Sequence, residues 1–119
     1  MNTPPIPATV ARLRQTFDSG KTRPIEWRLA QLGEIERAMR DHESDFADAL
    51  KKDLGKCRFE AVMTEMSFVE QEAKYARKHL RNWMRHTRVR TPMMAQPGRS
   101  YIEPEPKGVV LIIAPWNYP

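Results

Sequence analysis

The feature that most constrains this chain is a run of evenly spaced apolar residues between Phe59 and Trp83. Steps of three and four residues alternate along the run. Such spacing places the side chains along one face of an α-helix, where they form a continuous apolar seam. The sequence therefore predicts one long helix that packs its seam against another helix. The seam consists of Phe59, Val62, Met66, Val69, Ala73, Ala76, Leu80 and Trp83.

Three shorter helices are predicted upstream of the long one. The first covers residues 9–19. The second covers residues 25–42 and begins just after Pro24, where a first-turn proline belongs. Its apolar residues also recur at three- and four-residue steps, so it is the expected partner of the seam. The third has Ser44 as its N-cap and ends at Gly55.

The last twelve residues, GVVLIIAPWNYP, contain six consecutive apolar residues, Val109 to Ala114. A strand that is apolar on both faces is typical of a parallel sheet covered on both sides. A preceding strand is expected in residues 99–103, with Pro104 and Pro106 in the turn between the two strands. Nothing else in the sequence could supply neighbours for the apolar strand. We therefore expect it to be the first strand of a larger, truncated domain.

Composition places the chain among ordinary globular proteins. It has 119 residues, a net charge of +5 and a pI of about 9.7. No apolar run is long enough to span a membrane, and the N-terminus lacks the apolar core of a secretory signal. Its single cysteine suits a reducing cytoplasm. At the N-terminus, three prolines predict a loose extended arm: Pro4, Pro5 and Pro7.

Two features suggest functions other than small-molecule chemistry. Residues 73–102 contain eight cations and no acidic residue, with Tyr75 and Trp83 among them, as in a surface that follows nucleic-acid phosphates. The same cations are also favoured near a helix C-terminus by the helix dipole. The evenly spaced seam would equally suit a helical interaction module. Both a basic nucleic-acid-binding module and a helical interaction module are therefore alternatives.

Cys57 is the one candidate nucleophile by residue type. It lies between Lys56 and Arg58, just ahead of the long helix. Neighbouring cations and a helix N-terminus are both features that lower the pKa of a thiol in general. No histidine is near it in sequence, so an incidental loop cysteine is the simpler interpretation. His79 and His86 are two helical turns apart, too far for a helical metal site, and no metal is predicted.

Asn117 is the remaining polar candidate, since it lies three residues past the apolar run. Ligands of α/β sheets bind outside the carboxyl ends of the strands, and an asparagine amide there offers two N–H donors. Asparagine is also a common turn residue, and spacing alone favours that interpretation.

Several phrases of the sequence resemble the aldehyde dehydrogenase family. EPKGVVLIIAPWNYP resembles the segment at which the cofactor domain of that family begins. FDSGKTRPIEWRLAQLGEI, ALKKDLGK and EMSFVEQEAKYARKHLRNWM resemble the N-terminal helices of its class 3-like branch, which has a short N-terminus. The likeness extends from about Val10 to Pro119.

This resemblance implies an NAD(P)-dependent oxidation of aldehydes to carboxylic acids through a cysteine thiohemiacetal. Asn117 matches the asparagine of the family that stabilises the oxyanion. Four residues match the stretch that lines the nicotinamide-ribose side of the cofactor site: Ile113, Ala114, Pro115 and Trp116. The nucleophile and the general base would lie downstream, and Cys57 matches no catalytic position.

The resemblance also implies the fold and the partners. The complete family fold is α/β, with a Rossmann-like cofactor domain; this part of it is expected to be mostly helical, with two C-terminal strands. Residues 1–91 would form the helical segment, 92–107 the connector and first strand, and 108–119 the start of a truncated dinucleotide-binding domain. We expect a small aldehyde substrate and NAD or NADP as the ligands, with no nucleic acid and no membrane. We also expect a cytoplasmic homodimer at full length and no activity from the fragment alone.

Overall fold

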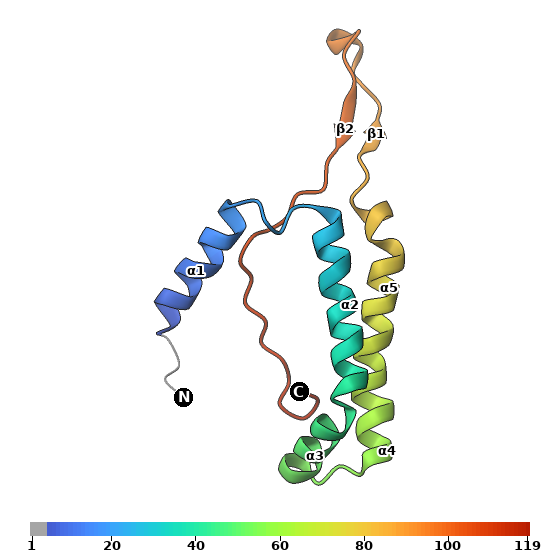
Figure 1. Ribbon diagram of the computed structural model, residues 1–119. Coiled ribbons are helices and arrows are strands. Elements are labelled where there is room, and N and C mark those ends of the chain that lie inside the picture. Colours follow the sequence, from blue (N-terminus) through green and yellow to red (C-terminus); the bar gives the residue numbers. More distant parts are fainter. Residues whose placement is uncertain (1–4) are drawn as a thin grey trace.

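Two antiparallel helices form the body of the molecule (Figure 1). The structure is a computed structural model that describes residues 5–119 and measures 64 × 34 × 25 Å. Helix α2 spans Ile25–Asp41 and packs along helix α5, which spans Ser67–Trp83. The predicted second helix and its pairing with the seam are therefore confirmed.

The other N-terminal helices start earlier than the sequence predicted. Helix α1 spans Ile6–Asp18, so Pro7 belongs to its first turn and not to an extended arm. A proline is tolerated there because the first helical N–H groups have no partner within the helix. Pro4 lies outside the described residues. Helix α3 spans Glu43–Leu54 with His42 at its N-cap, so the prediction of Ser44 as N-cap is wrong.

The predicted long helix exists, but it is not regular. Helix α4, Arg58–Ala61, leads into a five-residue π-helical turn, Val62–Met66, and then directly into α5. A π-turn rotates the side chains before it out of phase with those after it. Consequently Met66 is buried, whereas Phe59 is 75% exposed. The prediction of a continuous apolar seam is therefore wrong at its first residue.

A small apolar core lies where α3, α4 and the π-turn meet. Its buried members are Ala47, Leu50, Ala61 and Met66, and Met39 and Val62 pack against them. Of these residues, Val62 and Met66 belong to the predicted apolar seam. The core lies at the end of the helical body that is closest to the chain terminus labelled C in Figure 1.

The most buried side chain of α2 takes part in an ion pair and not in an apolar contact. The Glu36 carboxylate accepts a hydrogen bond of 2.8 Å from the Arg77 guanidinium of α5. The guanidinium lies beside Gly33, where a Cβ atom would come within 3.9 Å of it. The side chain of Glu36 is 6% exposed and that of Arg77 is 46% exposed. Arg77 thus covers the carboxylate on its solvent side.

We predict that Arg77→Ala lowers the free energy of unfolding by about 1–3 kcal/mol, because it leaves a buried carboxylate without its donor. Urea unfolding followed by far-UV circular dichroism measures the change. Arg81→Ala on the same helix is the matched control, since Arg81 lies 4.0 Å from Glu26 and both side chains are exposed. Its effect should stay below about 0.5 kcal/mol. Equal losses in the two variants would contradict the prediction.

Glu70 makes a second link between the same helices. It accepts hydrogen bonds from Arg40 of α2 at 2.9 Å and from Lys74 of α5 at 2.8 Å. The hydrogen bond from Lys74, more than any other interaction, lowers the pKa of Glu70 from its ordinary value. The two contacts together therefore stabilise the folded chain above the ordinary pKa of a glutamate, and this contribution is lost as the pH falls through the lowered value.

A β-hairpin projects from the helical body (Figure 1). Strand β1, Thr87–Val89, pairs antiparallel with strand β2, Ser100–Ile102, and Thr87 faces Ile102 across the ladder. A short 3-10 turn, Met93–Ala95, closes the far end. The strand around residue 100 was predicted, whereas β1 was not.

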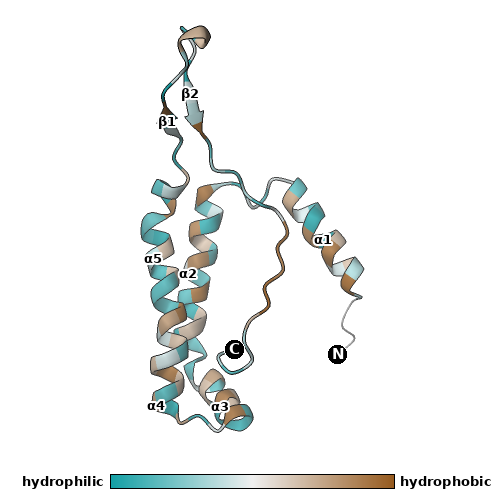
Figure 2. Cartoon of the chain, turned by 180° about the vertical axis from the view of Figure 1, so that it is seen from behind, coloured by the Kyte–Doolittle hydropathy of each residue, from teal (hydrophilic) through white to brown (hydrophobic). Residues whose placement is uncertain are grey.

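The apolar run after the hairpin is extended but unpaired. The structure assigns no strand to residues 109–113, so their pairing within a larger domain stays a prediction. Figure 2 shows this segment as a hydrophobic stretch set apart from the helices. Leu111, Ile112 and Ile113 are 82–86% exposed, and no described strand pairs with the segment that carries them. The predicted class, mostly helical with two strands, is confirmed. None of the helices in residues 5–119 is long and apolar enough to cross a membrane.

Candidate functional site

The predicted site residues lie on a tight turn at the end of the apolar run. The Tyr118 backbone N–H donates to the Pro115 carbonyl at 3.3 Å, which places Trp116 and Asn117 in the two central positions of the turn. The Asn117 side chain is exposed. The backbone of Asn117 is thus part of a turn, and its side-chain amide remains available as a hydrogen-bond donor.

The four predicted cofactor residues are also exposed. Ile113 and Trp116 have 86% and 85% of their surface in solvent, and Ala114 and Pro115 between them are exposed as well. Together they form one apolar edge that leads directly to Asn117. Such an edge fits the wall of a ligand site, where apolar side chains cover most of the ligand and a few polar groups orient it.

Lys56 anchors this turn to the helical body. It follows Gly55, whose left-handed backbone (φ 69°) ends α3 and reverses the chain. The Lys56 ammonium donates to the Asn117 carbonyl oxygen at 3.1 Å and lies 3.9 Å from the centre of the Tyr118 ring. These two contacts hold the peptide unit between Asn117 and Tyr118 against the helical body.

The carboxylate of Glu65 holds the ammonium in place. Lys56 donates to Glu65, and their side chains are only 10% and 11% exposed. Glu65 belongs to the π-turn, so the irregular helix places a carboxylate beside the anchor and Met66 in the core. π-turns are frequent at functional sites. A buried charge pair with further donors and acceptors is costly to break, which makes this anchor rigid.

A surface cavity of about 440 Å³ lies between the turn and the helices. Trp116 and Pro119 form one side of it, and Glu65 contributes the polar group next to the anchor. The remaining lining comes from the α2 end, α3 and the residues after α4: Met39, Phe46, Ala49, Leu50, Asp53, Leu54, Met66 and Val69. Trp116 and Pro119 therefore border this cavity while remaining largely exposed to solvent.

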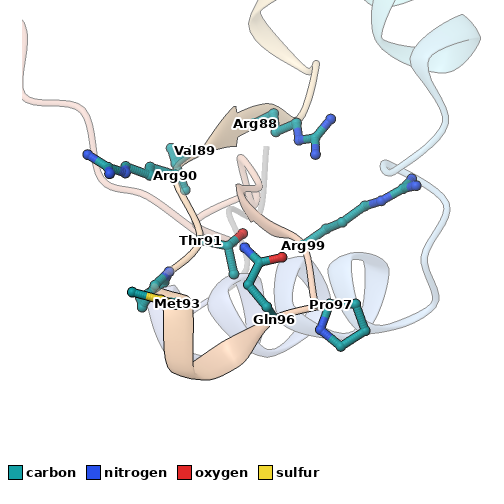
Figure 3. A pocket seen from close by; sticks show the side chains of 10 residues that line it. Arg88, Val89, Arg90, Thr91, Met93, Gln96, Pro97 and Arg99 are labelled. Atoms are coloured by element: carbon teal, nitrogen blue, oxygen red, sulfur yellow. The ribbon is translucent and has the colours of Figure 1, made fainter.

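A larger cavity, of about 800 Å³, lies in the hairpin loop at the other end of the molecule. Arg88, Arg90 and Arg99 line it, but their guanidinium groups point in different directions (Figure 3). They do not converge on a single point where an anion could bind. This cavity is therefore not the candidate site.

The remaining candidates make no contact that marks a second site within residues 5–119. Cys57 is exposed and has no disulfide partner within residues 5–119. His79 belongs to an aromatic stack on α5, with ring centres 4.1 Å from Tyr75 and 5.9 Å from Trp83. Among the described residues, no three His, Cys, Asp or Glu side chains come together as a metal site.

Sequence reasoning missed Lys56, Glu65 and Tyr118 as parts of the site. Lys56 was noticed only as a neighbour of the cysteine, yet 61 positions separate it from the carbonyl that it binds. A contact over that distance along the chain leaves no periodic signal. The one local sign is a cation placed directly after a helix-ending glycine.

Comparison with known proteins gives the same family by sequence and by structure. Residues 3–119 match the aldehyde dehydrogenase family. The chain is 44% identical over 115 residues to aldehyde dehydrogenase family 3 member B2 of Mus musculus, covering 97% of this chain and 24% of that protein. It is 45% identical over 103 residues to 4,4'-diaponeurosporen-aldehyde dehydrogenase of Staphylococcus aureus, covering 87% of this chain and 22% of that protein.

A solved structure, the substrate-bound state of Staphylococcus aureus AldH, superposes with a TM-score of 0.90. Its sequence is 41% identical, and the match covers all of this chain and 26% of that one. The chain therefore spans about a quarter of the length of the relatives that it matches. Sequence and structure agree over nearly every residue, and the chain belongs to the aldehyde dehydrogenase family.

Proposed function

We propose that this chain is part of a longer enzyme, called here the full-length enzyme, that oxidises aldehydes to carboxylic acids with NAD or NADP. The observation that carries the proposal is the turn at Asn117, in a chain that matches the family over residues 3–119. Asn117 is exposed, its backbone carbonyl accepts a hydrogen bond from the buried Lys56, and it follows an exposed apolar edge. The relatives are named as aldehyde dehydrogenases, which supports the same reaction here.

In this proposal Asn117 acts on the aldehyde oxygen. Attack by a cysteine thiolate on the aldehyde carbon converts the carbonyl into a thiohemiacetal and places negative charge on its oxygen. The Asn117 amide donates a hydrogen bond to that oxygen, where a single donor of this kind contributes about 3–4 kcal/mol. The attacking cysteine and the general base would lie in the part of the enzyme outside these 119 residues, so the isolated chain is expected to be inactive.

The apolar edge fits one wall of a dinucleotide site. Four consecutive residues have exposed side chains and no strand pairing: Ile113, Ala114, Pro115 and Trp116. They would hold the nicotinamide-ribose end, and the bound dinucleotide would supply the acceptor for the hydride that leaves the aldehyde carbon. The chain's own residues would orient the carbonyl and exclude water from it.

The proposal extends to the assembly and the cellular compartment of the full-length enzyme. We infer a cytoplasmic homodimer that takes a small aldehyde as its substrate. Analytical ultracentrifugation of the full-length enzyme tests the dimer, and fractionation of the native cell tests the compartment.

A dinucleotide-reduction assay tests the reaction itself. The full-length enzyme should reduce NAD or NADP when an aliphatic or aromatic aldehyde is added, and the 119-residue chain should not. Failure to reduce either dinucleotide with any aldehyde would contradict the proposal. Salt-dependent retention of DNA by the same protein would instead support the nucleic-acid alternative.

We predict that Cys57→Ser leaves turnover of the full-length enzyme within about twofold, a change of under about 0.5 kcal/mol in the barrier. Cys57 is exposed and forms no disulfide within residues 5–119. Steady-state kinetics with aldehyde at saturating dinucleotide measure the effect. A loss of two or more orders of magnitude would show that Cys57 is the nucleophile.

A further inference from the structure

We propose that Lys56, held by Glu65, is the positioning residue for Asn117 in aldehyde oxidation. The proposal rests on the function inferred above and adds to it a residue from a different part of the chain. Lys56 lies in the loop between α3 and α4, and its partner Glu65 lies in the π-turn. Neither residue is expected to contact the aldehyde. They act through the backbone of the turn.

The contacts of Lys56 fix the orientation of one peptide unit. Its ammonium donates to the Asn117 carbonyl at 3.1 Å and lies 3.9 Å from the centre of the next side chain, the Tyr118 ring. The direction of a side-chain amide depends on the backbone that carries it. Holding the carbonyl of Asn117 in one direction therefore restricts where its amide can point.

Burial of Lys56 and Glu65 limits the positions that the Lys56 ammonium can take. The side chains of Lys56 and Glu65 are 10% and 11% exposed, so water competes little for the ammonium. The ammonium has three N–H donors. Glu65 and the Asn117 carbonyl each accept one, and the Tyr118 ring covers a further side. With these partners in place the ammonium has few alternative positions, and the turn is held at one distance from the helices.

The anchored turn needs such support because little else holds it. The segment that leads to it is exposed and unpaired from residue 110 to residue 114. Trp116 and Pro119 line the edge of a surface cavity, and Trp116 is 85% exposed. A catalytic group displaced by about 1 Å can lose about 100-fold in rate. The Lys56 contact is thus the link that sets the position of the donor.

Lys56→Met tests the proposal in the full-length enzyme, because methionine keeps the apolar stem and removes the ammonium. We expect turnover at saturating dinucleotide to fall by about 10- to 100-fold. Lys56→Arg keeps a cationic donor and should recover a part of the loss. Lys52→Met is the matched control, since Lys52 is an exposed lysine of α3; its turnover should stay within about twofold of the unchanged enzyme.

The deciding measurement combines Lys56→Met with Asn117→Ala. If Lys56 acts through Asn117, removing Lys56 should change turnover by less than about twofold once the amide is gone. An equal loss in both backgrounds would show a merely structural role and overturn the proposal. No loss in Lys56→Met alone would also overturn it.

The single variants separate this proposal from the proposed function. A normal Asn117→Ala enzyme would reject the oxyanion role and the positioning role together. An impaired Asn117→Ala enzyme with an additive Lys56→Met effect would reject the positioning role alone. If Lys56→Met fails to fold, Tyr118→Leu replaces it, because Tyr118 is 52% exposed. Tyr118→Leu should lower turnover several-fold with Asn117 present and leave it unchanged with Asn117 absent.

Discussion

The 119-residue chain is expected to self-associate, and the double variant Leu111→Lys/Ile113→Lys is expected to remain monomeric. Leu111 and Ile113 are 84% and 86% exposed on an extended segment that has no paired strand in residues 5–119. An exposed apolar strand offers free backbone N–H and C=O groups to a second copy. Two lysines placed along it would oppose that pairing by like-charge repulsion.

Light scattering across a concentration series measures the association. Circular dichroism on the same samples should show that both proteins remain rich in helix, since the helices lie elsewhere in the chain. The unchanged chain should gain mass with concentration, whereas the double variant should not. A monodisperse unchanged chain would contradict both the prediction and the expectation that residues 109–113 are a strand in need of neighbours.

The hairpin provides the matched control for this experiment. Met93 and Met94 are 86% and 101% exposed, so Met93→Lys/Met94→Lys adds the same charge at equally exposed apolar positions. They lie in the short 3-10 turn of the hairpin loop and not in an extended segment. If association depends on strand pairing, this variant should associate like the unchanged chain. If it depends only on net charge, both double variants should be monomeric.

The helical part of the fold could be predicted because its signals are local. Gly55 ends α3 in a left-handed conformation, as the sequence indicated, and Pro24 precedes α2. Three- and four-residue spacing identified the pairing of α2 with α5. The π-turn was missed because apolar spacing alone does not distinguish a π-turn from a regular helical turn, and it left Phe59 exposed.

The strands and the anchor could not be predicted in the same way. A strand exists only through its partner, and the apolar pattern at residues 109–113 predicts a strand without showing what pairs with it. The hairpin instead pairs Thr87–Val89 with Ser100–Ile102, and its residues are mostly exposed. The contact of Lys56 with Asn117 depends on how the helical body folds. Sequence therefore indicated the functional turn but not the residues that hold it.

Asn117→Ala is expected to lower kcat/KM for aldehyde by roughly 10²–10³ in the full-length enzyme, while the dinucleotide Kd changes little. The oxygen gains its charge only after the aldehyde carbon has been attacked. A donor directed at that oxygen therefore stabilises the transition state more than the bound substrate. Single-turnover rates and dinucleotide titrations on one preparation measure the two quantities separately.

The turn interpretation of Asn117 makes the opposite prediction. The Pro115–Tyr118 hydrogen bond closes the turn through backbone atoms, and the Lys56 contact also uses the backbone carbonyl of Asn117. Alanine keeps all of these atoms, so the turn should survive and the melting temperature should change little. A turn residue without a chemical role would then leave the chemistry near normal. Near-normal single-turnover chemistry in folded Asn117→Ala would exclude the oxyanion role.

Asn117→Asp sharpens the distinction, because it is nearly the same size as asparagine and differs in charge and donors. A carboxylate offers no N–H donor and repels the developing oxyanion, so Asn117→Asp should be at least as impaired as Asn117→Ala. A role in shape alone predicts that aspartate, a good turn residue, is tolerated better than alanine. The order of the two variants in single-turnover rate therefore decides between a donor and a turn.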